Sequence, residues 1–385
     1  MSALRSAMAP RLALPVLCAI AGAASAADWS LAPHFGLNGE YNTNPYLQSQ
    51  DTGNRSGFIF DASLPLGAKT ERTDFKLGLD AHLRHYNDDS FQNRDDERLS
   101  TSIIQTSERN SWSGSAAWAR DTTLTSELGT TGRTQTNKRH NRYEASINPQ
   151  IQLSERSLAS FGVSGELNRY QDADLTGLVD YSYTSGYAGY SRLVGELTSV
   201  GFAAVVGAQS VPDRSSSDSV NALLRVSLSH DYSERLHLES YLGPIYARSQ
   251  ALERWGAGGR LALKYGGLRT DFSFSAEQQL APAGLGSLTV HDAASLVMTN
   301  HLKEKLSIVT ALAYQRSQEA LPIAGTSAHH TRYWRAEESL RWQRTETLSI
   351  GLVVGKIRQK SSDQVDYADG LFARLGINWT PSPLF

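Results

Sequence analysis

The sequence has little cysteine, little methionine and few long apolar runs. Its single cysteine, Cys18, lies near the start, and only three methionines occur in 385 residues. The chain can therefore form no internal disulfide, and beyond position 18 it offers no thiolate ligand and no thiol nucleophile. After the first 26 residues, no segment reaches the ~18 consecutive apolar residues that a transmembrane helix needs. These absences exclude thiol chemistry and helical membrane spans from most of the chain.

The first 26 residues have the pattern of a secretory leader. Arg5 and Arg11 lie before a short apolar stretch over 12–21. Ala24-Ser25-Ala26 supplies a small-x-small cleavage site. We predict a signal peptide over 1–26 and a single mature domain over 27–385. A lipoprotein anchor is disfavoured, because the residue before Cys18 is Leu17 rather than a small residue.

The charge of the chain is close to balanced. The formal net charge is −2, and the leader carries two arginines and no acid, so the mature chain has a formal charge of −4. A nucleic-acid-binding protein should be clearly basic, so we expect no nucleic-acid partner.

Apolar and polar residues alternate with period two through the rest of the chain. In 268–280, for example, Phe272 and Phe274 alternate with Asp271 and Glu277. Successive strand side chains point to opposite faces, so one face of this segment is apolar and the other charged. Most alternating segments run to twelve residues or more, whereas soluble strands average about five or six. Such strands can cross a bilayer at a tilt of roughly 40°.

Breaks in the alternation divide the chain into eighteen expected strands. They are 29–41, 55–68, 72–86, 98–108, 111–121, 140–153, 157–170, 180–194, 197–211, 218–231, 235–248, 254–265, 268–280, 288–301, 305–317, 332–344, 347–360 and 366–379. We predict an all-β fold, a transmembrane antiparallel up-and-down β-barrel of about eighteen strands without a plug domain. Pro149 and Pro244 fall inside two strands, where each removes a ladder donor and is a candidate bulge, and they leave sixteen strands as the alternative.

Tight turns alternate with longer polar connections. Four turns share a hydroxyl–Glu–Arg signature, which suits a tight turn because the hydroxyl satisfies the local backbone. They are Thr70-Glu71-Arg72, Ser107-Glu108-Arg109, Ser154-Glu155-Arg156 and Ser233-Glu234-Arg235. Short periplasmic turns and long outer loops are typical of barrels in the bacterial outer membrane. Eight tight turns and nine long connections place both termini on the periplasmic side.

Aromatic residues are placed near the ends of several strands. Trp255 and Tyr265 share one face, ten residues apart, which is roughly 25 Å across a membrane. Trp334 and Trp342 bracket another strand, and Trp379 ends the last one. Aromatics favour strands in general, but the whole set indicates girdles at the two membrane interfaces.

One part of the sequence resembles a known family. The segment from Gly36 to Leu47, the Ser-Glu-Arg turns, and a last strand from Gly370 to Trp379 followed by Pro381 resemble the β-barrel porins encoded with exopolysaccharide biosynthesis and export clusters. The resemblance covers the mature chain as an architecture, and its one local motif is short. It implies an outer-membrane barrel that helps a polymer to cross the membrane, with no catalytic residues to carry over.

The end of the chain departs from the usual pattern of outer-membrane barrels, in which a terminal Phe ends the last strand. Here Phe385 follows Pro381 and Pro383, so a strand cannot run to the terminus. We expect the signal for membrane insertion to lie in 371–379 instead.

The polar strand faces are expected to line a lumen. The charged candidates are Lys76, Asp80, His82, Arg84, Glu144, Glu166, Arg225, Glu239, Arg260, Lys264, Arg269, Asp271, Glu277, Arg335, Glu337, Arg341 and Arg374. Cations slightly outnumber acids, which favours an anionic solute such as a uronic-acid-rich polysaccharide, and mixed charge holds a water-filled pore. The plainer alternative is that these groups pair with one another only to solvate the lumen.

The longest connection, 122–139, is rich in threonine and ends in a basic cluster. Its candidates Arg133, Lys138 and Arg139 could narrow the pore or bind anionic lipopolysaccharide. An ordinary solvated loop is the competing interpretation.

No motif indicates catalysis, a cofactor or a metal. Asp95-Asp96-Glu97 lacks the spacing of a calcium loop, and Gly256-Ala257-Gly258-Gly259 resembles a phosphate loop but lies in an expected strand with no helix after it. There is no nucleophile elbow. We therefore expect a protein that is not an enzyme.

Three functions fit these features. The first is passive export of an exopolysaccharide, coupled to periplasmic partners, which predicts a loop-gated lumen lined by arginine, aromatics and carboxylates. The alternative is a general diffusion porin for small solutes, which predicts an inward-folded constriction with charges on opposing walls. The third, a barrel enzyme acting on lipid or glycan, needs Ser, His and Asp within hydrogen-bond reach. Expected partners are outer-membrane lipid, lipopolysaccharide and the polysaccharide.

Overall fold

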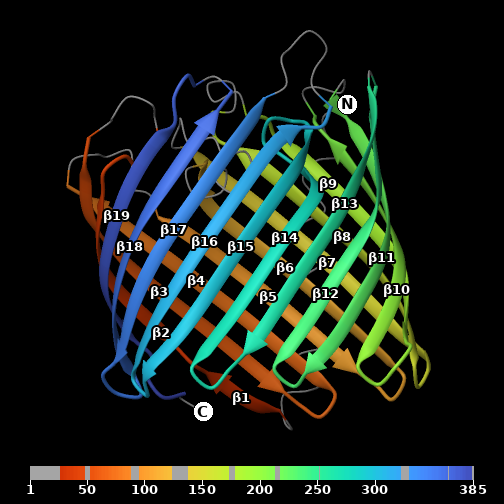
Figure 1. The fold of residues 1–385 in the computed structure, drawn as a ribbon, viewed down its shortest axis with the longest axis horizontal. Coiled ribbons are helices and arrows are strands. Elements are labelled where there is room, and N and C mark those ends of the chain that lie inside the picture. The colour runs from red at the N-terminus through yellow and green to blue at the C-terminus, as the bar shows by residue number, and fades with distance from the viewer. Residues whose placement is uncertain are drawn as a thin grey trace, which may run out of the picture.

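The structure is a computed structural model that describes residues 27–47, 53–87, 95–123, 138–172, 178–212, 217–250, 252–321, 329–362 and 364–383. The expected leader 1–26 lies outside these ranges. Most of the described residues form antiparallel strands (Figure 1). The strands are β1 (Asp28–Leu31), β2 (His34–Asn42), β3 (Arg55–Lys69), β4 (Thr73–Tyr86), β5 (Asp96–Thr106), β6 (Asn110–Thr122), β7 (Arg139–Ser154), β8 (Ser157–Tyr170), β9 (Tyr181–Leu193), β10 (Thr198–Ser210), β11 (Ser219–Ser233), β12 (Leu236–Ser249), β13 (Glu253–Gly266), β14 (Thr270–Pro282), β15 (Leu288–Lys303), β16 (Leu306–Glu319), β17 (His330–Gln343), β18 (Leu348–Ser361) and β19 (Ala368–Trp379). None of the described residues forms a helix long and apolar enough to cross a membrane.

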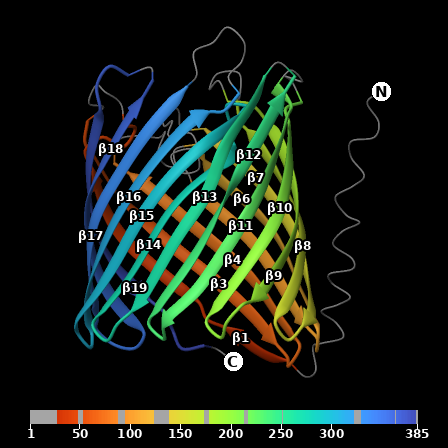
Figure 2. The same ribbon diagram turned by 45° about the vertical axis from the view of Figure 1, so that its right-hand side comes forward.

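The sheet closes on itself. From β2 onward each strand pairs with the next one in the chain, and β19 pairs with β2, with Trp379 opposite Phe35. The last strand therefore leaves no open edge beside the first (Figures 1 and 2). The part of the chain that the structure describes contains no separate plug domain inside this barrel.

The first predicted strand is interrupted by a proline. β1 and β2 both pair with β3 in one continuous register, with Leu31 opposite Leu66 and His34 opposite Ser63. Pro33 lies between them and has no N–H to donate to the ladder. β1 and β2 are thus two halves of one barrel strand. The predicted eighteen-stranded antiparallel barrel is confirmed, and the sixteen-stranded alternative is wrong.

The prolines inside strands do not cause bulges. Around Pro149 the pairing of β7 with β8 skips two residues and resumes in the same register, from Ile147–Val163 to Gln150–Ser160. Pairing of β11 with β12 is interrupted in the same way at Pro244. The expectation of bulges at these prolines was wrong, because each proline removes a hydrogen bond without inserting a residue. The register shifts lie instead beside tight turns, between Gln152 and Ser154, Asp231 and Ser233, and His301 and Lys303.

The hydroxyl residues of the tight turns accept backbone hydrogen bonds, as their signature predicted. Thr70 Oγ1 accepts a hydrogen bond from the N–H of Thr73 at 3.0 Å. Ser233 Oγ accepts from the N–H groups of Arg235 and Leu236, both at 3.2 Å. These bonds close the turns locally. The short turns gather at one end of the barrel, where β1 and the C-terminal end also lie (Figure 2).

The outward face of the barrel is an apolar belt. Leu242 is 68% exposed and Trp255 is 69% exposed, although both side chains are apolar. Trp334 and Trp342 lie on the outward face of β17, and Trp379 stacks on Phe35 with ring centroids 5.6 Å apart. A closed barrel with this much exposed apolar surface is stable only in a membrane. The chain is therefore an outer-membrane protein.

One carboxylate interrupts this belt. Glu338 shares the outward face of β17 and lies midway between Trp334 and Trp342. Its Oε2 accepts a hydrogen bond from Thr310 Oγ1 at 2.9 Å. Ionisable groups that face lipid are costly, and this bond satisfies only part of the carboxylate.

We expect Glu338→Leu to raise the free energy of unfolding by about 1 kcal/mol, because it removes a polar group from the lipid-facing belt. Urea unfolding in phospholipid vesicles measures this change. The adjacent Glu337 is the control. It faces the lumen and accepts two hydrogen bonds from Arg335, at 2.6 and 2.8 Å, so Glu337→Leu should destabilise the barrel. Destabilisation by both variants would contradict a lipid-facing position for Glu338.

Candidate functional site: the constricted lumen

The tip of one hairpin leaves the barrel wall. Pairing between β13 and β14 ends at Gly259 and Gln278. Residues 279–282 of β14 remain paired with β15, with Pro282 opposite Leu288. The end of this hairpin therefore departs from β13 as one unit.

The hairpin tip packs against the interior of a distant part of the wall. Ala283 is 1% exposed, and Leu288 is fully buried with Ala247 of β12. Val179, in the connection before β9, donates its N–H to the carbonyl of Gly284 at 2.8 Å. Strands β10 to β13 separate β9 from β14 along the wall. A contact between these two connections must therefore cross the lumen, and it narrows the barrel at the end with the long connections.

Two glycines allow this close packing. A Cβ on Gly284 would lie 2.7 Å from the hydroxyl oxygen of Tyr170, and a Cβ on Gly286 would lie 2.5 Å from Val179 Cγ2. Gly286 also has a φ of +79°, which side-chain-bearing residues rarely adopt. Larger residues at either position would push the tip off the wall.

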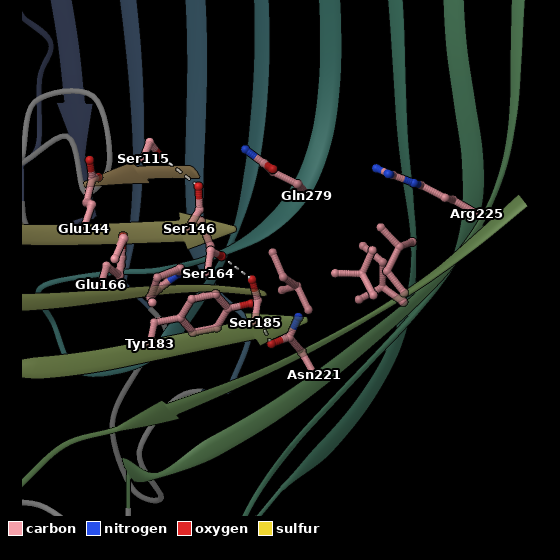
Figure 3. Close-up of a pocket in the computed structure, with 18 of the residues that line it drawn as sticks. Ser115, Glu144, Ser146, Ser164, Glu166, Tyr183, Ser185, Asn221, Arg225 and Gln279 are labelled. Atoms are coloured by element: carbon pink, nitrogen blue, oxygen red, sulfur yellow. Dashed lines mark hydrogen bonds between the residues drawn. The ribbon is translucent and has the colours of Figure 1, made fainter. Parts of the chain in front are cut away.

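A cavity of about 490 Å³ lies between the tip and the wall (Figure 3). Its floor is a row of hydroxyls on neighbouring strands, since Ser115, Ser146, Ser164 and Ser185 are successive cross-strand partners. Ser115 and Ser146 are hydrogen-bonded at 2.9 Å, and Ser164 and Ser185 at 2.8 Å. Small side chains keep this part of the lumen wide, while the hydroxyls keep it polar.

Opposite charges face each other across the cavity. Glu144 and Glu166 project from β7 and β8, and Arg225 projects from β11 on the other side (Figure 3). Glu144 also forms an ion pair with Arg142 of its own strand at 3.2 Å. The Arg225 guanidinium lies 5.3 Å from the ring centroid of Tyr241, whose hydroxyl donates to Glu277 at 2.9 Å. These contacts hold Arg225 in place without neutralising it. The arrangement creates a transverse field that acts on any ion or dipole in the cavity.

Charges on the opposite wall are paired. Arg374 Nε donates to Glu40 at 3.1 Å, and the Tyr86 hydroxyl donates to the same carboxylate at 3.1 Å. Arg84 and Asp96 form an ion pair at 2.6 Å. On this wall the charged groups pair with one another and so solvate the lumen, which was the alternative to a solute-binding role.

The structure places most predicted lumen residues on the inward strand face. These residues are Lys76, Asp80, His82, Arg84, Glu144, Glu166, Arg225, Glu239, Arg260, Lys264, Asp271, Glu277, Arg335, Glu337, Arg341 and Arg374. Within the described ranges, the cations Arg225, Arg260, Lys264 and Arg341 form no ion pair.

Two positions differ from the prediction. Arg269 lies in the turn between β13 and β14 rather than in the wall, because the strand begins at Thr270. Arg139 is the first residue of β7 rather than part of the loop, and it donates to the backbone carbonyl of Asp95. Lys138 pairs with Asp172 at 2.8 Å. Arg133 lies outside the described residues, so its role stays a prediction.

Sequence reasoning missed the hairpin tip and the serine row. The tip has a weak local signal, since 281–286 reads APAGLG and is apolar, but the connection after β16 contains a similar run, ALPIAG, at 320–325. The serine row has none, because it depends on the register of four strands. Among the described residues, no three His, Cys, Asp or Glu side chains gather in a group that could hold a metal ion.

Solved structures share this fold at low sequence identity. Pseudomonas aeruginosa OccK2 (OpdF) is 11% identical, with a TM-score of 0.51, and the match covers 93% of this chain and 98% of that one. Pseudomonas aeruginosa OpdQ is 9% identical, with a TM-score of 0.50 over 93% and 98% of the two chains. A BenF-like porin from Pseudomonas fluorescens Pf-5 is 9% identical, with a TM-score of 0.50 over 92% and 99%. No protein-family model matches the chain, and no curated protein sequence matches it significantly.

Removing the charges that face the cavity should change ion selectivity. We expect Glu144→Gln with Glu166→Gln to shift selectivity toward anions, and Arg225→Ala to shift it toward cations, because each change removes one side of the transverse field. The reversal potential in planar bilayers under a KCl gradient measures both shifts. Glu338→Gln is the control, since it removes a carboxylate from the outer face. A shift of equal size in the control would show that Glu144, Glu166 and Arg225 do not set the ion selectivity.

Proposed function

We propose that the chain is a passive channel for small solutes, which is the diffusion-porin alternative of the sequence analysis. The observation that carries this proposal is the inward hairpin tip, which narrows the lumen beside Glu144, Glu166 and Arg225. An inward constriction with charges on opposing walls is the feature that separates a diffusion porin from a polymer conduit. Such a constriction favours solutes that are small enough to pass the hairpin tip. It also favours polar solutes, whose lost hydration is replaced by contacts with the hydroxyl and charged side chains.

The comparisons support the same proposal. The likeness to OccK2 and OpdQ supports the barrel, and the BenF-like structure is described as a porin. The solved structures add no support for exopolysaccharide export, which stays a prediction from the resemblance at Gly36–Leu47. The tip also argues against a polymer conduit, because a polymer chain would have to displace its buried contacts at Leu288 and Val179.

The size limit of the channel tests this proposal. Purified protein in liposomes should admit small sugars and amino acids and exclude oligosaccharides, as measured by swelling rates over a series of solute sizes. Swelling by long oligosaccharides at rates close to those of monosaccharides would support the polymer conduit instead. No swelling with any solute would refute passive transport altogether.

Deletion of the hairpin tip should widen the channel. We expect a variant that lacks 283–286 to show a higher single-channel conductance and a larger solute limit, because it loses the contact with Val179 and the segment that crosses the lumen. A variant that replaces Arg269 by Ala, in a turn at the opposite end, is the control and should conduct like the parent protein. Unchanged conductance after the deletion would show that the tip is not the constriction.

A further inference from the structure

The barrel wall is not closed over its full height. β13 begins at Glu253, but its pairing with β14 begins only at Gly259. Over 253–258, β13 pairs with β12 alone, and no backbone partner occurs on its other side among the described residues. This gap is the counterpart of the inward tip, because the part of β14 that should cover the edge has moved into the lumen.

The gap lies at the height of the girdle nearer the long connections, where the outer leaflet meets water. Trp255 faces outward from this part of β13 and contacts Tyr246 of β12, with ring centroids 4.8 Å apart. Tyr265, near the opposite end of β13, lies beside Phe272 in the second girdle. Unpaired backbone groups cost several kcal/mol each in hydrocarbon and are tolerated where they line a cavity. The exposed edge of β13 therefore indicates an opening rather than a sealed wall.

A cavity of about 220 Å³ lies at the gap, and residues from both faces of the wall line it. Ala257 and Gln278 line it from outward-facing positions, while Ala247 lines it from the lumen side. Ile245 and Leu280 line both this cavity and the large lumen cavity. Among the described residues, these two apolar side chains lie where the two cavities meet.

The glycine-rich segment that resembled a phosphate loop forms the edge of the gap. A Cβ on Gly256 would meet no atom within 4 Å, so the space beside it is open. A Cβ on Gly258 would lie 2.5 Å from Ile245 Cδ1, so glycine is needed for Ile245 to fold over the strand. Gly256 thus leaves the edge of β13 without a side chain, and Gly258 lets the Ile245 side chain pack against the backbone of β13.

We propose that the gap between β13 and β14 is a lateral opening, through which small apolar solutes pass between the lumen and the outer leaflet of the membrane. Its lining is mainly apolar, with Ile245, Ala247, Leu280, Val290 and Ala320 as the main surfaces. Arg254 is the one charged side chain among the described residues that line it, so a solute with a single acidic group also fits. This inference rests on the proposed channel function, and it gives the channel a second exit through the wall.

A variant that fills the gap tests the proposal. Gly256→Phe places a large side chain in open space, so the barrel should still fold. Gly266→Phe is the matched control. It lies on the same strand at the far end from the gap, where a Cβ meets only Asp271 Oδ1 at 3.9 Å. The probe is N-phenyl-1-naphthylamine, whose fluorescence rises when it enters a membrane, and the cells are porin-deficient with an intact lipopolysaccharide layer.

The lateral opening predicts that the native protein and Gly266→Phe accelerate uptake of the probe, and that Gly256→Phe loses this acceleration. Arabinose-driven liposome swelling reports the axial channel and should be alike in all three proteins. Swelling without any protein-dependent uptake of the probe would overturn the lateral opening and leave the channel standing. Uptake by Gly256→Phe equal to that of the control would also overturn it, whereas absence of swelling would overturn the channel itself.

Cross-linking measures the gap without a solute. Ala257 and Leu280 would be partners if the β13–β14 ladder continued, and Leu261 and Ala276 are partners in its closed part. Because the only natural cysteine is Cys18, in the expected leader, Ala257→Cys with Leu280→Cys introduces one new pair, and Leu261→Cys with Ala276→Cys is the control. The control pair should oxidise readily and the gap pair slowly, since a disulfide needs Cβ atoms about 3.5–4.5 Å apart. Equal rates would show that the wall is closed.

Discussion

Every backbone polar group that meets hydrocarbon must have a partner, and the rest of this structure depends on that constraint. It explains why β19 returns to β2 and why the two halves of the first strand keep one register across Pro33. It also explains why prolines occur within strands without shifting the register, since a shift would unpair many groups while a missing donor unpairs one. The same constraint makes the bare edge of β13 significant, because it is the place where the pairing stops short.

Closure of the sheet also determines what the lumen can be. Because side chains alternate between the two faces, a strand that presents apolar residues to lipid must present its other residues to the interior. On β2 to β5 the inward charges are paired, as with Glu40 and Arg374, and they mainly solvate the wall. On β7 to β13 several of them line a cavity, where Glu144 is paired with Arg142 but Arg225 is held by Tyr241 rather than by an acid. The two sides of the lumen therefore have different roles.

Local rules in the sequence were sufficient for the barrel but not for its constriction. Period-two alternation and hydroxyl turns such as Thr70 and Ser233 depend on neighbouring residues, so strand number, strand faces and turn positions could be predicted. The hairpin tip depends on Val179 meeting Gly284, two residues in connections that are far apart in the chain. Arg269 was misplaced for a smaller reason, because alternation continues through the turn and hides the start of the strand. The serine row required the register of four strands, which no single segment encodes.

The constriction and the gap are two consequences of one displacement. The residues of β14 that leave β13 are the residues that enter the lumen, and Leu280 lines the cavities on both sides. The buried contacts of Leu288 and Val179 offset the backbone pairing that β13 loses, so the tip is held inward by apolar packing rather than by the ladder. If the tip returned to the wall, the gap would close and the lumen would widen. A narrow axial path and a lateral opening therefore belong to the same conformation of this hairpin.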